Sequence, residues 1–204
     1  IDDNDKVRLL IDPTSTYGKA AAAAMGRAMD DEIITAALGT AQTGKDGGTS
    51  TALPAGQKIA HGSAGLTVAK LLSAKETLDA ASVDPSIART IVVSPKQVSD
   101  LLNTTEIKSS DFNTVKALAQ GEINSFMGFN FITSNRLTTD TNGNRQVICF
   151  ASDGVKVAMG KEPMAKIDER ADKSYATQVY YCMSIGSTRM EEEKVVQIDC
   201  DESA

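Results

Sequence analysis

Residues 39–46 carry the pattern closest to a known ligand-binding motif. The run Gly39-Thr40-Ala41-Gln42-Thr43-Gly44-Lys45-Asp46 matches the glycine–x4–glycine–lysine of a phosphate-binding loop up to its last position. That position requires a hydroxyl group for magnesium, whereas Asp46 would direct a carboxylate at the phosphates. The motif should also follow a strand and open a helix, but here it follows a helical pattern. A flexible exit from a helix is the better interpretation.

The single histidine, His61, is the second candidate for chemistry. It lies in a small polar segment, with Ser63 and Ser50 nearby in the sequence. Serine hydrolases need an imidazole that is held by a buried carboxylate, together with an oxyanion hole. The sequence places neither feature around His61, so an exposed loop histidine is predicted.

Several acidic segments could in principle bind a cation. Asp140-Thr141-Asn142-Gly143-Asn144 resembles the start of a calcium loop, but its glycine comes too early and Ala151 stands where the loop requires glutamate. A hairpin turn explains this segment better. The other acidic groups are interpreted as solvated surface charge: Asp2-Asp3-Asn4-Asp5, Glu191-Glu192-Glu193, and Asp30-Asp31 beside Arg27. The sequence therefore predicts no catalytic, cofactor-binding or metal site, and no cofactor.

The composition narrows the class of protein. The 204 residues include 27 acids, 21 bases and one histidine, which gives a formal net charge of −6. This balance argues against a general nucleic-acid binder, which needs cations that displace counterions from phosphates. The longest apolar run, Ala20–Met25, is far shorter than the roughly 20 residues that span a bilayer. Three widely spaced cysteines, Cys149, Cys182 and Cys200, predict no disulfide framework or zinc site and favour a reducing, cytosolic setting.

The elements that would position these residues begin with a long helix over residues 16–38. Its possible N-caps are Thr14, Ser15 and Thr16, and Gly39 is a ready C-terminal stop. Apolar residues recur every four positions from Tyr17 to Ala37, with Ala24 and Ala28 alongside. Because this stripe is mostly alanine, whatever packs on it must come close. Enlarging Ala24 or Ala28 is expected to overpack that contact.

The middle of the chain alternates between loops and short elements. Residues 39–65 are rich in Gly, Thr, Ser and Ala and are predicted to be a mobile connection. The following segments are predicted in chain order: a helix over 67–82, a buried strand over 90–93, a helix from the Ser94-Pro95-Lys96-Gln97 capping box to Leu102, and a short helix from Ser110 to Gly121.

The remaining segments are predicted to be antiparallel strands. Phe129–Thr133 and Gln146–Phe150 form a hairpin with Asn142-Gly143 at its turn. Thr177–Ile185 alternates strictly between apolar and polar residues and is expected to pair with Ala165–Arg170. Val195–Cys200 is the final strand. Helices and strands mix without βαβ regularity, which indicates an α+β fold.

The order of these segments resembles that of the major capsid proteins of tailed bacteriophages and prophages, which have the Hong Kong phage type of coat fold. No single motif carries the resemblance; the succession of elements does. The matching segments are a spine-like helix (16–38), the axial strand and helix start (Arg89–Pro95), the stretch leading into the central axial strands (Ser109–Phe112 and Gly121–Phe129), a long peripheral hairpin (Asp168–Asp172 with Thr177–Ile185) and a returning last strand (Glu191–Cys200).

The resemblance implies an α+β coat fold with two domains. Residues 1–50 and 154–190 would form a peripheral domain, with the spine helix at about 16–38 and the hairpin at about 165–187. Residues 51–153 and 191–204 would form an inserted axial domain. The implied function is that of a virion structural protein, a major capsid subunit that assembles into an icosahedral phage or prophage-derived head enclosing DNA, and not that of an enzyme.

The same resemblance implies partners and a location. The partners would be other copies of the chain, in pentamers and hexamers, with scaffold, portal or decoration proteins. No sequence-specific nucleic-acid binding and no membrane contact are expected, and the head would be assembled in the bacterial cytoplasm. The family carries an N-terminal arm and an extended loop before the spine, and neither is found upstream of Ile11. We therefore expect that these parts were removed or that the chain is a fragment.

The sequence leaves two alternative functions open. The first is an encapsulin-like shell protein, which shares this coat fold and encloses cargo in place of DNA. The second is a phosphate-binding or hydrolytic enzyme that uses Gly44-Lys45 or His61.

Overall fold

The computed structural model describes residues 14–103 and 125–203. The predicted helix from Ser110 to Gly121 and the acidic run at residues 2–5 lie outside the described residues. Within them, helices combine with parallel and antiparallel strands, as the predicted α+β class requires. The chain divides into two compact units, Ile1–Glu32 with Val157–Gly186, and Ile33–Lys156 with Ser187–Ala204.

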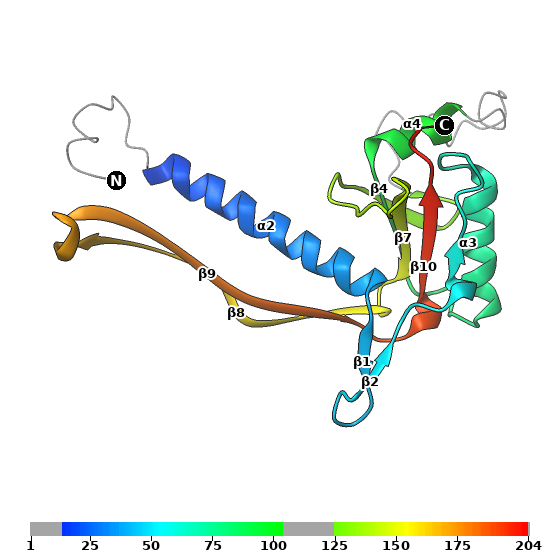
Figure 1. Cartoon of the computed structure of the whole chain (residues 1–204), viewed down its shortest axis with the longest axis horizontal. Coiled ribbons are helices and arrows are strands. Elements are labelled where there is room, and N and C mark those ends of the chain that lie inside the picture. Colours follow the sequence, from blue (N-terminus) through cyan, green and yellow to red (C-terminus); the bar gives the residue numbers. More distant parts are fainter. Residues whose placement is uncertain (1–13, 104–124, 204) are drawn as a thin grey trace. The chain divides into compact units, whose positions relative to one another are not determined.

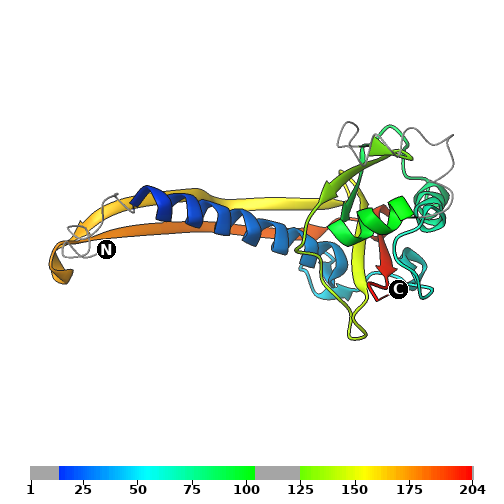
Figure 2. The same ribbon diagram turned by 90° about the horizontal axis from the view of Figure 1, so that it is seen from above.

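The first unit contains most of a long helix and most of a long two-stranded ribbon (Figures 1 and 2). Helix α2 spans Thr14–Leu38, which confirms the predicted helix. The ribbon pairs β8 (Val155–Arg170) with β9 (Ala176–Arg189), and a 3-10 turn, η2 (Ala171–Lys173), joins them. The predicted pairing is thus confirmed, and the strands are longer than expected.

The helix approaches the ribbon through its small residues. A Cβ atom placed on Gly18 would lie 3.1 Å from the hydroxyl of Tyr181. Ala21, Met25 and Met29 are half-buried, at the predicted spacing of four residues. Ala24 and Ala28 are exposed, so the expectation that larger side chains there would overpack the contact is wrong. Each comes one position before a methionine of the stripe and is turned about 100° from that methionine around the helix axis.

The second unit is built on a six-stranded mixed sheet. The strand order is β3-β10-β7-β4-β6-β5, with β10 antiparallel to β7, and β4 antiparallel to β7 but parallel to β6. The strands are β3 (Lys58–Ile59), β4 (Arg89–Val93), β5 (Ser125–Phe126), β6 (Phe129–Thr133), β7 (Arg145–Ala151) and β10 (Val195–Cys200). The strands predicted at 90–93, 129–133, 146–150 and 195–200 are confirmed.

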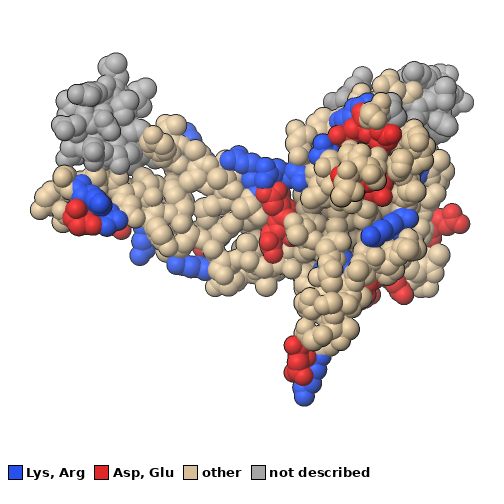
Figure 3. All heavy atoms as spheres, in the orientation of Figure 1, with Lys and Arg blue, Asp and Glu red and all other residues tan. Residues whose placement is uncertain are grey.

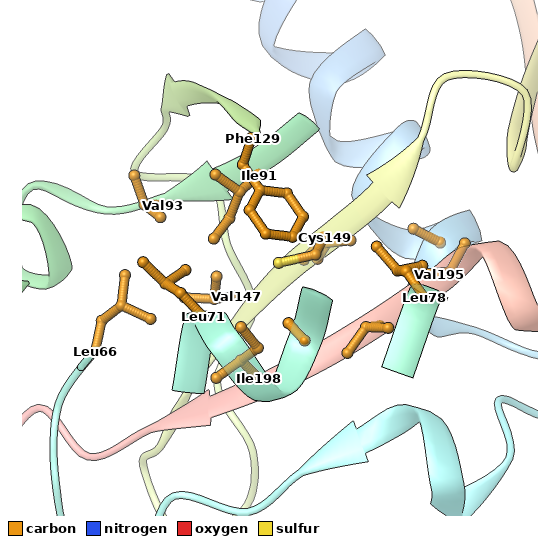
Figure 4. Packing of buried hydrophobic residues seen from close by; sticks show 14 of the residues in the cluster. Leu66, Leu71, Leu78, Ile91, Val93, Phe129, Val147, Cys149, Val195 and Ile198 are labelled. Carbon is orange, nitrogen blue, oxygen red and sulfur yellow. The ribbon is translucent and has the colours of Figure 1, made fainter. Parts of the chain in front are cut away.

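The core of this unit lies between the sheet and α3 (Val68–Ala80). Leu71, Ala74 and Leu78 of the helix are fully buried against strand residues such as Ile91 and Ile198 (Figure 4). Four consecutive residues of β10 are buried, because both faces of this central strand are covered. Leu72 of the same helix, in contrast, is 52% exposed.

Side chains cap the starts of two helices, and one of these caps was predicted. The Thr67 side chain accepts a hydrogen bond from the amide of Lys70 at the start of α3. At the start of α4 (Pro95–Asn103), the Gln97 side chain accepts a hydrogen bond from the Ser94 amide at 2.8 Å, which is one half of the predicted capping box.

The expectation of a mobile connection over residues 39–65 is wrong. The segment holds the hairpin of β1 (Ala41–Thr43) and β2 (Thr49–Thr51), then η1 (Ala55–Gln57) and β3. Gly44 and Gly47 adopt positive φ in the turn, which glycine allows without a steric penalty. Strands made of Thr, Ser and Gln carry no apolar alternation, so the sequence pattern did not reveal them.

The predicted hairpin between Phe129–Thr133 and Gln146–Phe150 is also wrong, although both strands exist. Strand β4 lies between β6 and β7 and pairs with both. The turn at Asn142-Gly143 does form, with Gly143 at φ +87°, but it leads back only to a single bridge between Thr139 and Arg145.

The sequence-based division after residue 50 also differs from the observed units. Ile34 and Ala37, near the end of α2, are buried in the core of the second unit, so this unit begins at Ile33.

Candidate assembly surfaces

The structure places the phosphate-loop-like residues where they cannot bind a nucleotide as such a loop would. Gly39 follows the end of α2, and residues 41–43 form β1. Lys45 and Asp46 occupy the exposed turn between β1 and β2, where Figure 3 shows charged side chains gathered. No helix begins there, so no helix N-terminus faces a phosphate.

Among the described residues, His61 contacts a neighbouring backbone group and no serine hydroxyl is bonded to it. Its Nδ1 atom accepts a 3.1 Å hydrogen bond from the backbone amide of Ser63, and Ser50 lies in β2. The imidazole contributes to lowering the pKa of Asp140 and Asp201, although hydrogen bonds from Asn144 and Ser203 are the main causes. These contacts stabilise loops.

The acidic segments are occupied by local partners. The Asp140 carboxylate accepts bonds from the amides of Asn142 and Asn144 and from the Asn144 side chain, all at 2.8 Å. Glu191 pairs with Lys194 at 3.1 Å. Among residues 14–103 and 125–203, no group of three or more His, Cys, Asp or Glu side chains is placed to hold a metal ion. None of the described helices has the length and apolar character to cross a bilayer.

The three cysteines are free thiols in different environments. Cys149 and Cys200 are buried in the sheet, and burial raises the pKa of both, that of Cys200 to about 12. Cys182 lies half-buried on the ribbon, where a hydrogen bond with Lys161 lowers the pKa of its thiol. The sheet cysteines therefore act as small core residues.

Buried cations, which sequence reasoning missed, hold the second unit together. The Arg189 side chain is fully buried at the end of β9 and donates to the carbonyl oxygens of Ala37 (3.0 Å), Gly39 (2.7 Å) and Thr51 (2.9 Å). It therefore fixes the end of α2 and the base of the β1–β2 hairpin to the end of β9. Cations favour helix C-termini, where carbonyl groups lack partners.

A second buried cation, Lys70, also binds backbone carbonyl groups of the second unit. The Lys70 ammonium group donates to the carbonyl oxygens of Ala64 (2.7 Å), Gly65 (2.8 Å) and Asp199 (3.0 Å). Burial lowers the pKa of Lys70. Its three bonds tie the loop before α3 to the end of β10.

The C-terminal segment is held by Glu202. Its carboxylate pairs with Arg145 through two bonds of 3.0 and 2.9 Å and accepts a 2.9 Å bond from the fully buried Gln97 side chain. The hydrogen bond from Arg145 is the main cause that lowers the pKa of Glu202.

The ribbon, by contrast, exposes apolar side chains. Ile167 is 56% exposed, Met159 51% and Tyr175 63%, and Val157 and Tyr180 are exposed with them. Figure 3 shows this part of the chain with few charged side chains on the visible face. A two-stranded ribbon cannot bury both of its faces within one unit. Several large exposed apolar side chains on one element are typical of a surface for protein association.

The unit of helix and ribbon and the unit of the six-stranded sheet together have the fold of a phage coat protein, as the following comparisons show. A sequence model described as "phage capsid protein" matches residues 1–202. The chain belongs to this family of phage capsid proteins, and it is a virion structural protein. Copies of the chain assemble into a shell, as in the family.

Solved structures of phage capsid and encapsulin proteins have a fold similar to that of this chain. A chain from Mycobacterium phage Che8 matches all of this chain and 68% of its own length, with a TM-score of 0.71 and 18% identity. The capsid of cyanophage P-SCSP1u matches 98% of this chain and 70% of its own, with a TM-score of 0.73 and 20% identity. A holo-encapsulin complex from Synechococcus elongatus matches 91% of this chain and 65% of its own, with a TM-score of 0.56 and 11% identity. No curated protein sequence matches the chain.

Proposed function

We propose that this chain is the major subunit of a phage head, and that it forms pentamers and hexamers which close into an icosahedral shell around DNA. The match of the capsid family over residues 1–202 is the observation that carries this proposal. The first unit would be the peripheral domain and the second the axial domain. Assembly would take place in the bacterial cytoplasm with scaffold and portal proteins as partners, and the subunit would have no catalytic role.

The ribbon supports a specific role in assembly. Its exposed apolar side chains would be covered by a neighbouring copy, because a shell made of one chain must supply both sides of every contact. Ile167 is a suitable probe, since it is exposed in the single chain and its replacement leaves the cores of both units intact.

The test is sedimentation velocity of the assembling protein and two variants. Ile167→Asp introduces a charge on the apolar surface and is expected to leave the protein as free subunits. Lys166→Asp introduces the same carboxylate at the adjacent exposed position, on the opposite face of the strand. We expect this control to sediment as assemblies, like the unmodified protein. Equal assembly of the two variants would contradict the role of the ribbon.

The encapsulin-like shell is the second candidate, supported by the fold match to the encapsulin complex. The contents of the particles distinguish the two functions. Nuclease-resistant DNA inside particles purified from the native host supports the phage head, whereas an enclosed protein without DNA supports the encapsulin-like function.

A further inference from the structure

An open cavity in the second unit, lined by charged, polar and apolar residues, has no role in the contacts described above. It has a volume of about 480 Å³ and lies where the end of α3, the loop over residues 81–88, the start of β4 and the β5–β6 turn meet. This volume falls within the range of small-ligand pockets.

The charges around the cavity are unbalanced. Lys75 and Arg89 line it together with one carboxylate, Asp79. Arg89 bonds Asp79 at 2.7 Å and the carbonyl oxygen of Val83 at 3.1 Å, and only 6% of its side chain is exposed. Within the described residues, its buried Nε atom has no hydrogen-bond partner and Lys75 forms no ion pair. One positive charge is therefore left in excess, in a chain of net charge −6.

No second carboxylate in the cavity wall cancels this excess, and the carboxylates of Asp84, Glu191 and Glu193 line the adjoining cavity. The last carbonyl groups of α3 could repel an anion, but those of Thr77 and Leu78 already accept bonds from the amides of Ala81 and Val83. The rest of the wall consists of Ser82, Gly128 and the apolar residues Val83, Pro85 and Met127.

We infer that this cavity binds a carboxylate group on a short aliphatic chain. Lys75 and Arg89 would attract the carboxylate, because charge-assisted hydrogen bonds are the strongest that side chains make. Val83, Pro85 and Met127 would contact the methylene groups. The carboxylate can come from a free small acid or from an acidic side chain of a second copy, and both sources present the same chemistry.

The second source has a candidate on this chain. Glu193 is exposed, and it lines a neighbouring cavity with Asp84 and Glu191. Ring contacts join two different patches of one chain, so a cationic cavity on one copy can receive an acidic residue of the next. This source rests on the proposed assembly function, whereas binding of a free acid does not.

The first arm of the experiment titrates the unassembled full chain with glutarate and follows backbone amide resonances by NMR. We expect saturable shifts at the cavity, weakened about tenfold or more by Lys75→Met, since one charged partner is lost. Lys45→Met, at the exposed β1–β2 turn, is the matched control and should bind like the unmodified chain. Both lysines lie outside the core, and thermal melting checks that each variant folds. Equal weakening in both variants would overturn the inference.

The second arm measures shell or ring formation by electron microscopy. Lys75→Glu is expected to block assembly and Glu193→Lys in the same chain to restore it, if a neighbouring copy supplies the carboxylate. Lys45→Glu is the control. Failure of glutarate to bind, together with normal assembly of Lys75→Glu, overturns the carboxylate site. Failure of the unmodified protein to assemble counts against the proposed function instead.

Discussion

The guanidinium group of Arg189 donates a 2.7 Å hydrogen bond to the carbonyl oxygen of Gly39, so the end of β9 is fixed to the end of α2. The two residues lie 150 positions apart in the chain. The bond therefore joins the places where both long elements of the first unit enter the second.

Arg189→Ala should lower the free energy of unfolding by about 3–5 kcal/mol, because it leaves three carbonyl groups at a buried site without a partner. Urea unfolding of the unassembled chain measures this change. Arg170→Ala is the control, since Arg170 pairs with Asp172 at the exposed end of the ribbon, and it should have little effect. If Arg189→Ala does not fold, Arg189→Lys replaces it, with an intermediate loss expected. Equal stability of all variants would contradict the role of Arg189.

Gly26 in the long helix and Gly39 just after its end should respond in opposite directions to replacement by alanine. A Cβ atom on Gly39 would lie 2.6 Å from the carbonyl oxygen of Thr35, so Gly39→Ala should destabilise the fold by about 1–3 kcal/mol. Nothing lies within 4 Å of a Cβ atom on Gly26, so Gly26→Ala should stabilise the helix by up to about 1 kcal/mol. Thermal melting of the unassembled variants distinguishes these effects. If both substitutions changed the stability in the same direction, the close approach of the Gly39 Cβ atom to Thr35 would not be the cause of the effect.

Glu202 should make stability depend on pH. Its hydrogen bond from Arg145 holds its pKa below the usual 4.5, so its ionised form binds more strongly in the folded state. Its contribution is therefore fully present above the unfolded-state pKa and is lost as the pH falls through the lower folded-state value. Urea unfolding at several pH values should show that Glu202→Gln is less stable than the unmodified chain at pH 7. The difference should shrink below about pH 4. A difference that is constant with pH would contradict this account.

Thiol reactivity should separate the three cysteines. The contact with Lys161 lowers the pKa of the half-buried Cys182, whereas burial raises the pKa of Cys149 and Cys200. A chromogenic disulfide reagent should therefore modify one thiol per native chain, and all three only after unfolding. Lys161→Met should slow that first reaction, and mass spectrometry should place it at Cys182. Rapid modification of Cys149 or Cys200 in the native chain would contradict the buried sheet.

Local sequence patterns predicted most of the described helices and strands correctly. The predictions failed where the structure depends on pairing between segments that are far apart in the chain. The stripe from Ala21 to Met29 and the apolar run of β10 reflect the period of a helix and of a buried strand, which a sequence displays directly. The turn at Asn142-Gly143 is equally local, but nothing in it says that β4 will enter between β6 and β7. A hairpin was therefore predicted where none forms.

The contacts of the buried cations could not be predicted from the sequence, for a related reason. Arg189 and Lys70 bind backbone carbonyl groups, and every residue carries one, so no residue type marks the partner. The cavity at Lys75 and Arg89 likewise joins α3, β4 and the β5–β6 turn, whose proximity only the sheet order creates.

Electron microscopy of the purified full-length protein at high concentration tests the central claim most directly. If the chain is a phage capsid subunit, the images should show closed shells, or rings of five and six subunits related by rotation. A protein that stays monomeric at every concentration, and also when it is co-produced with the other head proteins of its phage, would contradict the account.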